Sequence, residues 1–220
     1  MALSTICLAS FDLPSHSSSG YLLRYISPRA GPITLYAHLA RNPFFSKFAP
    51  GSDFVLGTGH GDSDSYSAQA EDIIWKAGQY DKRQTEGKVI YLLSCDTGLE
   101  LGPDLIDYGQ ARAFRGFTGD FLWIVQPGNW IAPYTDPHAG QILMPVVNGL
   151  NSLMDGATIS EAMDIEKNSY MKSMEDTNNE LLFSLLKWNY DHSILLGDPN
   201  ATIKPRPKIT LPIPPPPLIF

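Results

Sequence analysis

Cysteine, positive charge and long apolar runs are all scarce in this chain of 220 residues. Its two cysteines, Cys7 and Cys95, are too few for a disulfide framework, so we expect free thiols in a reducing, cytoplasmic setting. With 16 Lys and Arg against 23 Asp and Glu, the net charge of −7 argues against general nucleic-acid binding. No apolar run approaches the roughly 18 residues of a membrane span, and the N-terminus lacks the basic segment of a signal peptide. The sequence therefore predicts a globular protein with neither nucleic-acid nor membrane partners.

The length and composition fit one substantial domain. Apolar residues make up 43% of the chain and charged residues 18%, as in ordinary globular proteins, and this length suits one core better than two. We place the domain at residues 1–203. Residues 204–220 form a separate tail that carries seven of the 18 prolines and should be extended and polyproline-like. Two roles for the tail stay open: docking of its apolar end on a surface or partner, or a simple linker.

Apolar runs of strand length alternate with helical patterns along the chain. We predict strands at 4–9, 21–27, 53–60, 89–93, 121–125 and 193–197. We predict helices at 33–48, 103–114 and 138–153, and from two capping boxes that start at Thr158 and Thr177. The Ser-rich stretch 15–20 should be a loop, and 66–75 fits either a hairpin or a short helix. The alternation predicts an α/β fold, a three-layer sandwich with a mostly parallel sheet.

The run at 89–93 is the most informative stretch of the sequence. It is continuously apolar, which is typical of a strand buried on both faces, and it ends abruptly in the polar residues 94–98. Ligands and reacting groups of open α/β sheets lie at the carboxyl ends of strands, so Cys95 stands where a nucleophile would be placed. The preceding strand ends in His60, a histidine flanked by glycines. Two neighbouring strands would then supply a nucleophile and a base.

These residues and their spacing resemble the caspase-like cysteine peptidases, and among them the gingipain-like and CHAT-type domains. The resemblance rests on Gly57-Thr-Gly-His60-Gly61, followed about 35 residues later by Leu92-Leu-Ser-Cys95-Asp-Thr-Gly98. Further similar passages stand at 109–116, 130–136, 156–162 and 195–199. The resemblance covers roughly residues 50–200. It implies a caspase-like sheet and a cysteine endopeptidase that cleaves a protein or peptide without a cofactor.

The resemblance also implies a catalytic dyad, with Cys95 as the nucleophile and His60 as the base and acid. A thiol is only partly ionised near neutral pH, and a histidine can take its proton and later protonate the leaving amine. Backbone N–H groups of Gly61 and Cys95 suit the oxyanion hole, because glycine leaves the approach open. Gly57 and Gly59 should let the strand end turn sharply.

The substrate preference stays open in the sequence. Metacaspase-like relatives that cleave after basic residues carry an aspartate two positions before the nucleophile, where this chain has Leu93. Two kinds of substrate pocket therefore remain, an acidic one and an apolar one. Their candidate residues are Asp62, Asp96 and Asp120 for the acidic pocket, and Trp123 and Trp130 for the apolar one.

Three other interpretations compete with an active peptidase. His60, Asp62 and Asp64 have the spacing of a divalent-metal site in a metallohydrolase, but no second ligand cluster accompanies them, so we expect no metal. A dinucleotide-binding domain would need a Gly-x-Gly-x-x-Gly motif after the first strand, which is absent. A CHAT-like domain can also be a catalytically silent interaction module, or one that a regulatory partner protein activates. The loop 127–137 and the tail are the candidate switches.

Overall fold

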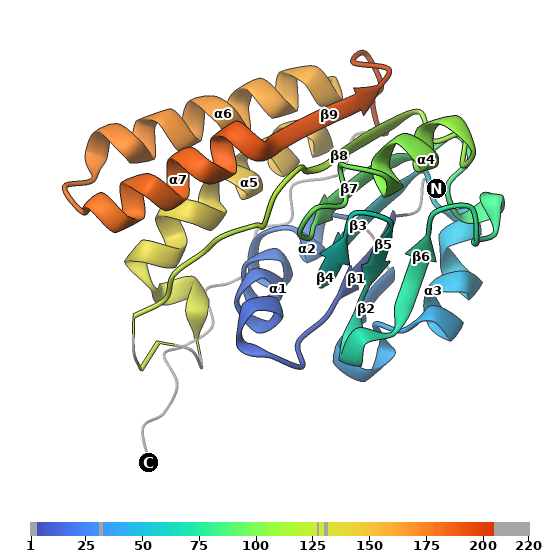
Figure 1. Ribbon diagram of the computed structural model, residues 1–220, viewed down its shortest axis with the longest axis horizontal. Coiled ribbons are helices and arrows are strands. Elements are labelled where there is room, and N and C mark those ends of the chain that lie inside the picture. The colour runs from blue at the N-terminus through green and yellow to red at the C-terminus, as the bar shows by residue number, and fades with distance from the viewer. Residues whose placement is uncertain (1–3, 31–32, 127, 130–131, 205–220) are drawn as a thin grey trace.

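A mostly parallel six-stranded sheet runs through the protein (Figure 1). The computed structural model describes residues 4–30, 33–126, 128–129 and 132–204. The strand order is β2-β1-β3-β7-β8-β9, in which β9 alone runs antiparallel to its neighbour. The strands are β1 (Ser4–Leu8), β2 (Ile33–Tyr36), β3 (Phe54–Thr58), β7 (Val89–Leu93), β8 (Ala113–Phe117) and β9 (Ser193–Gly197). A small antiparallel sheet follows β3 and consists of β4 (His60–Asp62), β5 (Ser65–Ser67) and β6 (Ile73–Lys76).

Helices cover both faces of the large sheet. One face carries α1 (Leu13–Tyr25), α5 (Pro137–Met154), α6 (Ile159–Asp176) and α7 (Glu180–His192). The other face carries α3 (Asn42–Phe48), α4 (Leu101–Asp107) and the small sheet. The short helix α2 (Ser27–Ala30) follows α1, and 3-10 turns lie at Ala37–Leu39, Ala49–Gly51, Gln69–Glu71, Lys82–Gln84 and Pro133–Thr135. The protein is therefore the three-layer α/β sandwich with a mostly parallel sheet that the sequence predicts.

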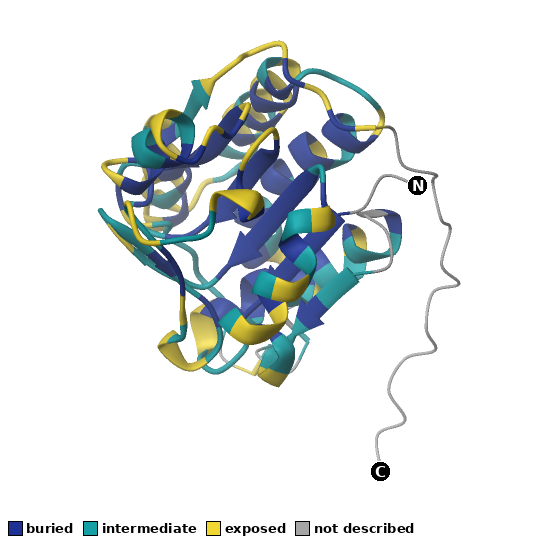
Figure 2. Cartoon of the chain, turned by 90° about the vertical axis from the view of Figure 1, so that its right-hand side faces the viewer, coloured by how far each residue is buried: buried dark blue, intermediate teal, exposed yellow. Residues whose placement is uncertain are grey.

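Side chains of the central strands alternate between two apolar cores. In β3, Phe54 and Leu56 enter the core beneath α1 and α5, whereas Val55 enters the core beneath α3 and α4. In β7, Tyr91 and Leu92 divide in the same way. Figure 2 shows the central strands buried and the exposed residues on the outer helices and turns. Burial on both faces explains why these strand sequences are continuously apolar.

Several predicted elements are confirmed. Strands occupy most of 4–9, 89–93 and 193–197, and β3 leads to His60, which itself begins β4. The helix predicted at 138–153 is α5, which runs unbroken through Pro145. The capping box at the start of α6 is present, with Thr158 and Glu161 bonded reciprocally.

The loop predicted at 15–20 and the strand predicted at 21–27 are wrong, because residues 15–25 belong to α1 and Ser27 begins α2. This helix starts at Asp12, whose side chain accepts a hydrogen bond from the backbone of the first turn. The serines of α1 are buried, and the hydroxyl groups of Ser19 and Thr58 lie 2.7 Å apart where the helix meets the sheet. Small polar side chains thus let the helix approach the strands closely, and burial overrides the loop-like composition.

The predictions for 103–114 and 121–125 are also wrong. The helix ends at Asp107 as α4, and the next strand is β8, which pairs with both β7 and β9. Arg115 made this strand hard to recognise in the sequence, because a charged residue is not expected inside a buried strand. In the structure Arg115 is fully buried, and its guanidinium pairs with the carboxylate of Glu166. Residues 121–125 continue beyond β8 as an extended segment, and within the described chain they pair with no strand.

Three smaller segments differ in detail from the predictions. Residues 33–48, expected to be a helix, are β2 followed by α3. The ambiguous segment 66–75 lies in the β5–β6 hairpin. The last long helix, α7, is capped by Asn179 rather than by Thr177.

The predicted tail lies outside the described residues, apart from Lys204. In the described part of the chain, no helix combines the length and apolar character needed to cross a membrane.

Candidate active site

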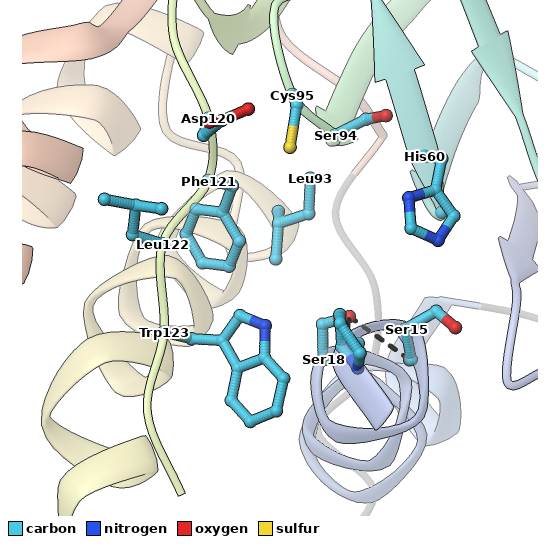
Figure 3. A pocket seen from close by; sticks show the side chains of 12 residues that line it. Ser15, Ser18, His60, Leu93, Ser94, Cys95, Asp120, Phe121, Leu122 and Trp123 are labelled. Carbon is cyan, nitrogen blue, oxygen red and sulfur yellow. Dashed lines mark hydrogen bonds between the residues drawn. The ribbon is translucent and has the colours of Figure 1, made fainter. Parts of the chain in front are cut away.

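A pocket of about 270 Å³ opens at the carboxyl ends of four neighbouring parallel strands. Its lining residues are Pro14, Ser15 and Ser18 after β1, Gly59 and His60 after β3, Leu93, Ser94 and Cys95 at the end of β7, and Asp120, Phe121, Leu122 and Trp123 after β8. Parallel strands bring these ends to one edge of the sheet, where ligands of open α/β folds bind. Figure 3 shows the thiol of Cys95 and the imidazole of His60 on the walls of this one pocket.

Cys95 lies in a tight turn that follows β7 directly. Asp96 has a left-handed backbone with φ of 54°, a conformation that aspartate tolerates better than most residues. The turn is attached to β8 and its continuation, because the N–H of Asp96 donates to the carbonyl of Gly119 at 3.2 Å and the N–H of Gly98 to that of Phe117 at 2.7 Å. Within the described chain, the backbone N–H of Cys95 donates to no protein acceptor, so it is available to a bound group.

The surroundings of the Cys95 thiol favour its protonated form. Burial raises the pKa of Cys95 to about 11, and the carboxylates of Asp120 and Asp96 add to this rise. The backbone N–H of Phe121 acts in the opposite direction but does not cancel it. The thiol is therefore neutral near pH 7 and becomes a nucleophile only when a base takes its proton. His60, whose imidazole can take such a proton, lines the same pocket.

His60 is held by a carboxylate that the sequence analysis missed. Its Nε2 atom forms a hydrogen bond with Asp12, which also accepts the backbone N–H of Ser15 at 2.8 Å and its hydroxyl at 2.5 Å. Burial disfavours the charged carboxylate, but the hydrogen bonds from Ser15 and His60 outweigh it and lower the pKa of Asp12. The ring of Phe11 packs beside the imidazole at 5.3 Å between centroids. With Nε2–H donating to the Asp12 carboxylate, the second ring nitrogen, Nδ1, carries the lone pair.

The sequence does contain a signal for Asp12. Residues 12–15, Asp-Leu-Pro-Ser, are a typical helix start with an N-cap and an early proline. This start directly follows β1, which is a neighbour of the strand that leads to His60. Because a strand was wrongly predicted at 21–27, no helix was expected after residue 12, and the helix-start signal at Asp12 was not used.

Gly61 lies against the Cys95 turn with no room for a side chain. A Cβ atom at this position would stand 2.2 Å from the carbonyl oxygen of Cys95. The sharp turn expected at Gly57 and Gly59 is wrong, because neither residue has a positive φ and Gly57 lies inside β3. Close packing explains Gly59 instead, since a Cβ there would be 2.1 Å from the carbonyl oxygen of Ser67.

The N–H of Gly61 points away from the strand that pairs with it. β4 and β5 are joined by a two-residue turn, so their closing pair, Asp62 and Ser65, is the hydrogen-bonded one. Pairs alternate along an antiparallel ladder, and the next pair, Gly61 with Tyr66, therefore exchanges no hydrogen bonds. The N–H groups of Gly61 and Cys95 are thus both free of ladder hydrogen bonds.

The segment after β8 forms the fourth wall of the pocket and is attached to α7. The side chain of Asn189 donates to the carbonyl of Leu122 at 2.6 Å and accepts its N–H at 2.9 Å. The indole N–H of Trp188 donates to the carbonyl of Asp120 at 2.8 Å. In an extended chain, successive residues direct their N–H and C=O groups to opposite sides. Because Leu122 faces α7, the backbone groups of Trp123 face the other way.

The structure brings some of the predicted site residues together and separates others. Those that line the pocket are His60, Cys95, Asp120 and Trp123. Asp62 and Asp96 are not among the lining residues, and Trp130 lies outside the described residues. Asp120 is exposed, so it stands at the surface rather than deep in the pocket.

The acidic residues near His60 do not form a metal site. In the part of the chain that the structure describes, no group of three or more His, Cys, Asp or Glu side chains is arranged to hold a metal ion. Asp64 pairs with Lys76 at 3.3 Å, and Nε2 of His60 is engaged by Asp12. The metallohydrolase interpretation therefore has no geometric support.

Comparison of the chain with models of known protein families finds no match, and comparison with curated proteins finds none either.

Proposed function

We propose that this protein is a cysteine endopeptidase of the caspase-like kind, with Cys95 as nucleophile and His60 as base and acid. One observation carries the proposal: the thiol and the imidazole line a single pocket, and the Asp12 carboxylate holds the far nitrogen of the imidazole. The substrate is a protein or peptide, and acyl transfer to a thiol needs no cofactor. Both cysteines are free, which suits a reducing cytoplasm.

The reaction proceeds in two halves. With Nε2–H donating to Asp12, the lone pair of His60 lies on Nδ1 and takes the proton of Cys95. The thiolate adds to the carbonyl carbon of the peptide bond, the carbon–nitrogen bond breaks, and the imidazolium gives its proton to the departing amine. His60 then takes a proton from water, the hydroxide adds to the thioester, and the carboxylic acid and the thiol are released.

Two backbone N–H groups fit the negative oxygen that forms in each half-reaction. The N–H groups of Gly61 and Cys95 have no partner in the β4–β5 ladder or in the Cys95 turn. Donors that are already in place stabilise the tetrahedral intermediate without reorganisation, and losing one typically costs about a hundredfold or more in rate. Gly61 packs closely against the Cys95 turn, which supports assigning the two N–H groups to one oxygen.

The extended segment 121–125 supports binding of a peptide main chain. Its N–H and C=O groups at Leu122 are bonded to α7, so those at Trp123 remain for a partner on the other side. A peptide substrate can pair with such an edge as an added strand, with its side chains entering pockets alternately. This arrangement favours an endopeptidase over a hydrolase of small thioesters or amides.

A second candidate, a latent domain that a partner activates, is favoured by a specific observation. With a pKa of about 11, the thiol of Cys95 is protonated near pH 7 and is not yet a nucleophile. Within the described chain no hydrogen bond joins Cys95 to His60. Binding of a substrate or a partner protein over the pocket would then have to bring the side chains of Cys95 and His60 together.

The test is labelling with a peptidyl acyloxymethyl ketone, followed by a peptide-library hydrolysis screen. We expect rapid labelling that disappears in Cys95→Ala and falls about a hundredfold or more in His60→Ala. His38→Ala, which changes a histidine of a distant 3-10 turn, is the matched control and should label like wild type. Labelling that is slow and insensitive to His60 would contradict an enzyme active on its own and favour the latent domain.

A further inference from the structure

We infer that the pocket beside Cys95 binds an uncharged, apolar side chain, such as leucine, methionine or phenylalanine, at the P1 position of the substrate. P1 is the residue whose carbonyl carbon the thiolate attacks. This inference rests on the proposed function and names the substrate class for the same site. It decides between the acidic and the apolar pocket that the sequence left open.

The walls of the pocket beyond the thiol are mainly apolar. Leu93, Phe121, Leu122 and Trp123 line it on the side of the sheet and of the segment after β8. In Figure 3 Leu93 lies between Cys95 and Trp123, and Trp123 stands opposite the first turns of α1. The volume of about 270 Å³ is slightly below the usual size of sites for drug-sized ligands, about 300–1,000 Å³, and suits a single side chain.

The hydroxyl groups on the opposite wall are already engaged. Ser15 donates to Asp12 at 2.5 Å, and Ser18 donates to the carbonyls of Pro14 and Ser15 at 3.2 Å each. Ser94 has no hydrogen-bond partner in the described chain, but its oxygen is buried, in the space that a Cβ of Gly61 would occupy. A substrate side chain therefore meets no spare donor on these walls.

Charged side chains at P1 would be poorly accommodated. Neither Lys nor Arg lines the pocket, so an aspartate or glutamate would lose its hydration without gaining an ion pair with either residue type. The carboxylate that lines it, Asp120, lies beside the thiol of Cys95 in Figure 3 and is exposed. A lysine or arginine long enough to pass Leu93 would place its charge beyond that carboxylate, against Trp123 and the engaged serines.

The experiment compares four acyloxymethyl ketones that differ only in P1, with Leu, Phe, Asp or Lys, on the full-length protein. The rate of Cys95 modification is followed by intact mass. We expect the Leu or Phe probe to react about tenfold or more faster than the Asp and Lys probes, the range that fit in an apolar pocket provides. A faster Asp or Lys probe would overturn the inference and leave the peptidase proposal standing. Peptidyl probes no faster than iodoacetamide, whatever their P1 residue, would overturn both.

Two variants locate the preference in this pocket. Trp123→Ala should slow the Leu probe about tenfold or more relative to the iodoacetamide rate measured on the same variant. Ser18→Asp places a carboxylate opposite Trp123 and should raise the relative rate of the Lys probe. Ser160→Asp adds the same charge at the start of α6 and should leave the preference unchanged. An unchanged preference in both pocket variants would also contradict the inference.

Discussion

At the scale of single residues, Asp12 has two roles that one substitution can separate. Its carboxylate caps α1 and holds Nε2 of His60. Asparagine caps a helix as well as aspartate does, but it cannot stabilise the imidazolium by charge. We therefore expect Asp12→Asn to keep the stability of the fold and to lower kcat/KM about a hundredfold or more. Steady-state kinetics and thermal unfolding measure the two effects.

Asp62→Asn is the matched control for this prediction. Asp62 is an exposed carboxylate on the same hairpin as His60 and does not line the pocket. Equal activity losses in the two variants would show that activity depends on the overall negative charge of the surface, and that Asp12 does not position His60.

The burial of the Cys95 thiol should be visible in the pH dependence of its labelling rate. Because burial raises the pKa of Cys95 to about 11, the thiolate fraction of the resting protein keeps growing across the alkaline range. The rate of iodoacetamide labelling should therefore rise up to about pH 11, whereas an ordinary cysteine levels off above about pH 8.5. A plateau near pH 8 or 9 would mean that the thiol is not shielded as the structure has it.

Gly61 should tolerate no side chain. In Gly61→Ala the new Cβ would meet the carbonyl oxygen of Cys95 at 2.2 Å, and the clash can be relieved only by a shift of the backbone, because the Cβ is attached directly to Cα and the oxygen belongs to the main chain. We expect loss of activity and a decrease in unfolding free energy of about 1–3 kcal/mol, measured by urea denaturation. Gly140→Ala is the control: its Cβ would have only the hydroxyl oxygen of Tyr21 nearby, at 3.3 Å, and should leave stability within about 1 kcal/mol of wild type.

At the scale of elements, α7 positions the wall of the pocket from outside the site. Asn189 is fully buried and satisfies both backbone groups of Leu122. Asn189→Ala leaves these groups without partners, which should cost about 1–3 kcal/mol of unfolding free energy. The same change should raise KM and speed hydrogen exchange in 120–126. Asn148→Ala, at an exposed asparagine of α5, should change stability by less than about 0.5 kcal/mol.

Elements could be predicted from the sequence where local pattern and tertiary burial agree. β7 is continuously apolar because both of its faces are covered, and the capping box of α6 is a purely local signal. The body of α1 and the strand β8 could not be predicted, since their partners lie far away in the chain, although residues 12–15 carry a local helix-start signal. Ser19 of α1 is paired with Thr58, and Arg115 of β8 with Glu166, 51 residues later.

The residues of the candidate site also divide into those with a local sequence signal and those whose position depends on packing. Cys95 and His60 could be found because each ends an apolar strand run, and parallel strands bring such ends together. Asp12 and the 120–123 wall depend on which helices cover the sheet, and on where β8 lies. Those features depend on packing, so the pocket could be only half described from the sequence.

At the scale of the whole molecule, one buried ion pair joins the sheet to its helical layer. Arg115 of β8 and Glu166 of α6 are both fully buried, and the hydroxyl of Tyr91 donates to Glu166 at 2.5 Å. The guanidinium also lies over the ring of Phe117, with its carbon 4.0 Å from the centroid. Tyr91 is in β7, the strand that leads to Cys95, so this network links the strand below the pocket to α6.

Removing one partner should cost more than removing the charge from both. Arg115→Met leaves the carboxylate of Glu166 buried without its partner, and we expect it to lower the unfolding free energy by about 3–5 kcal/mol. Adding Glu166→Gln removes that charge and keeps an acceptor for Tyr91, so the double variant should be more stable than Arg115→Met alone. A double-mutant cycle in urea denaturation measures the difference. Independent, additive losses would show that the pair is not coupled, and that apolar packing alone holds α6 on the sheet.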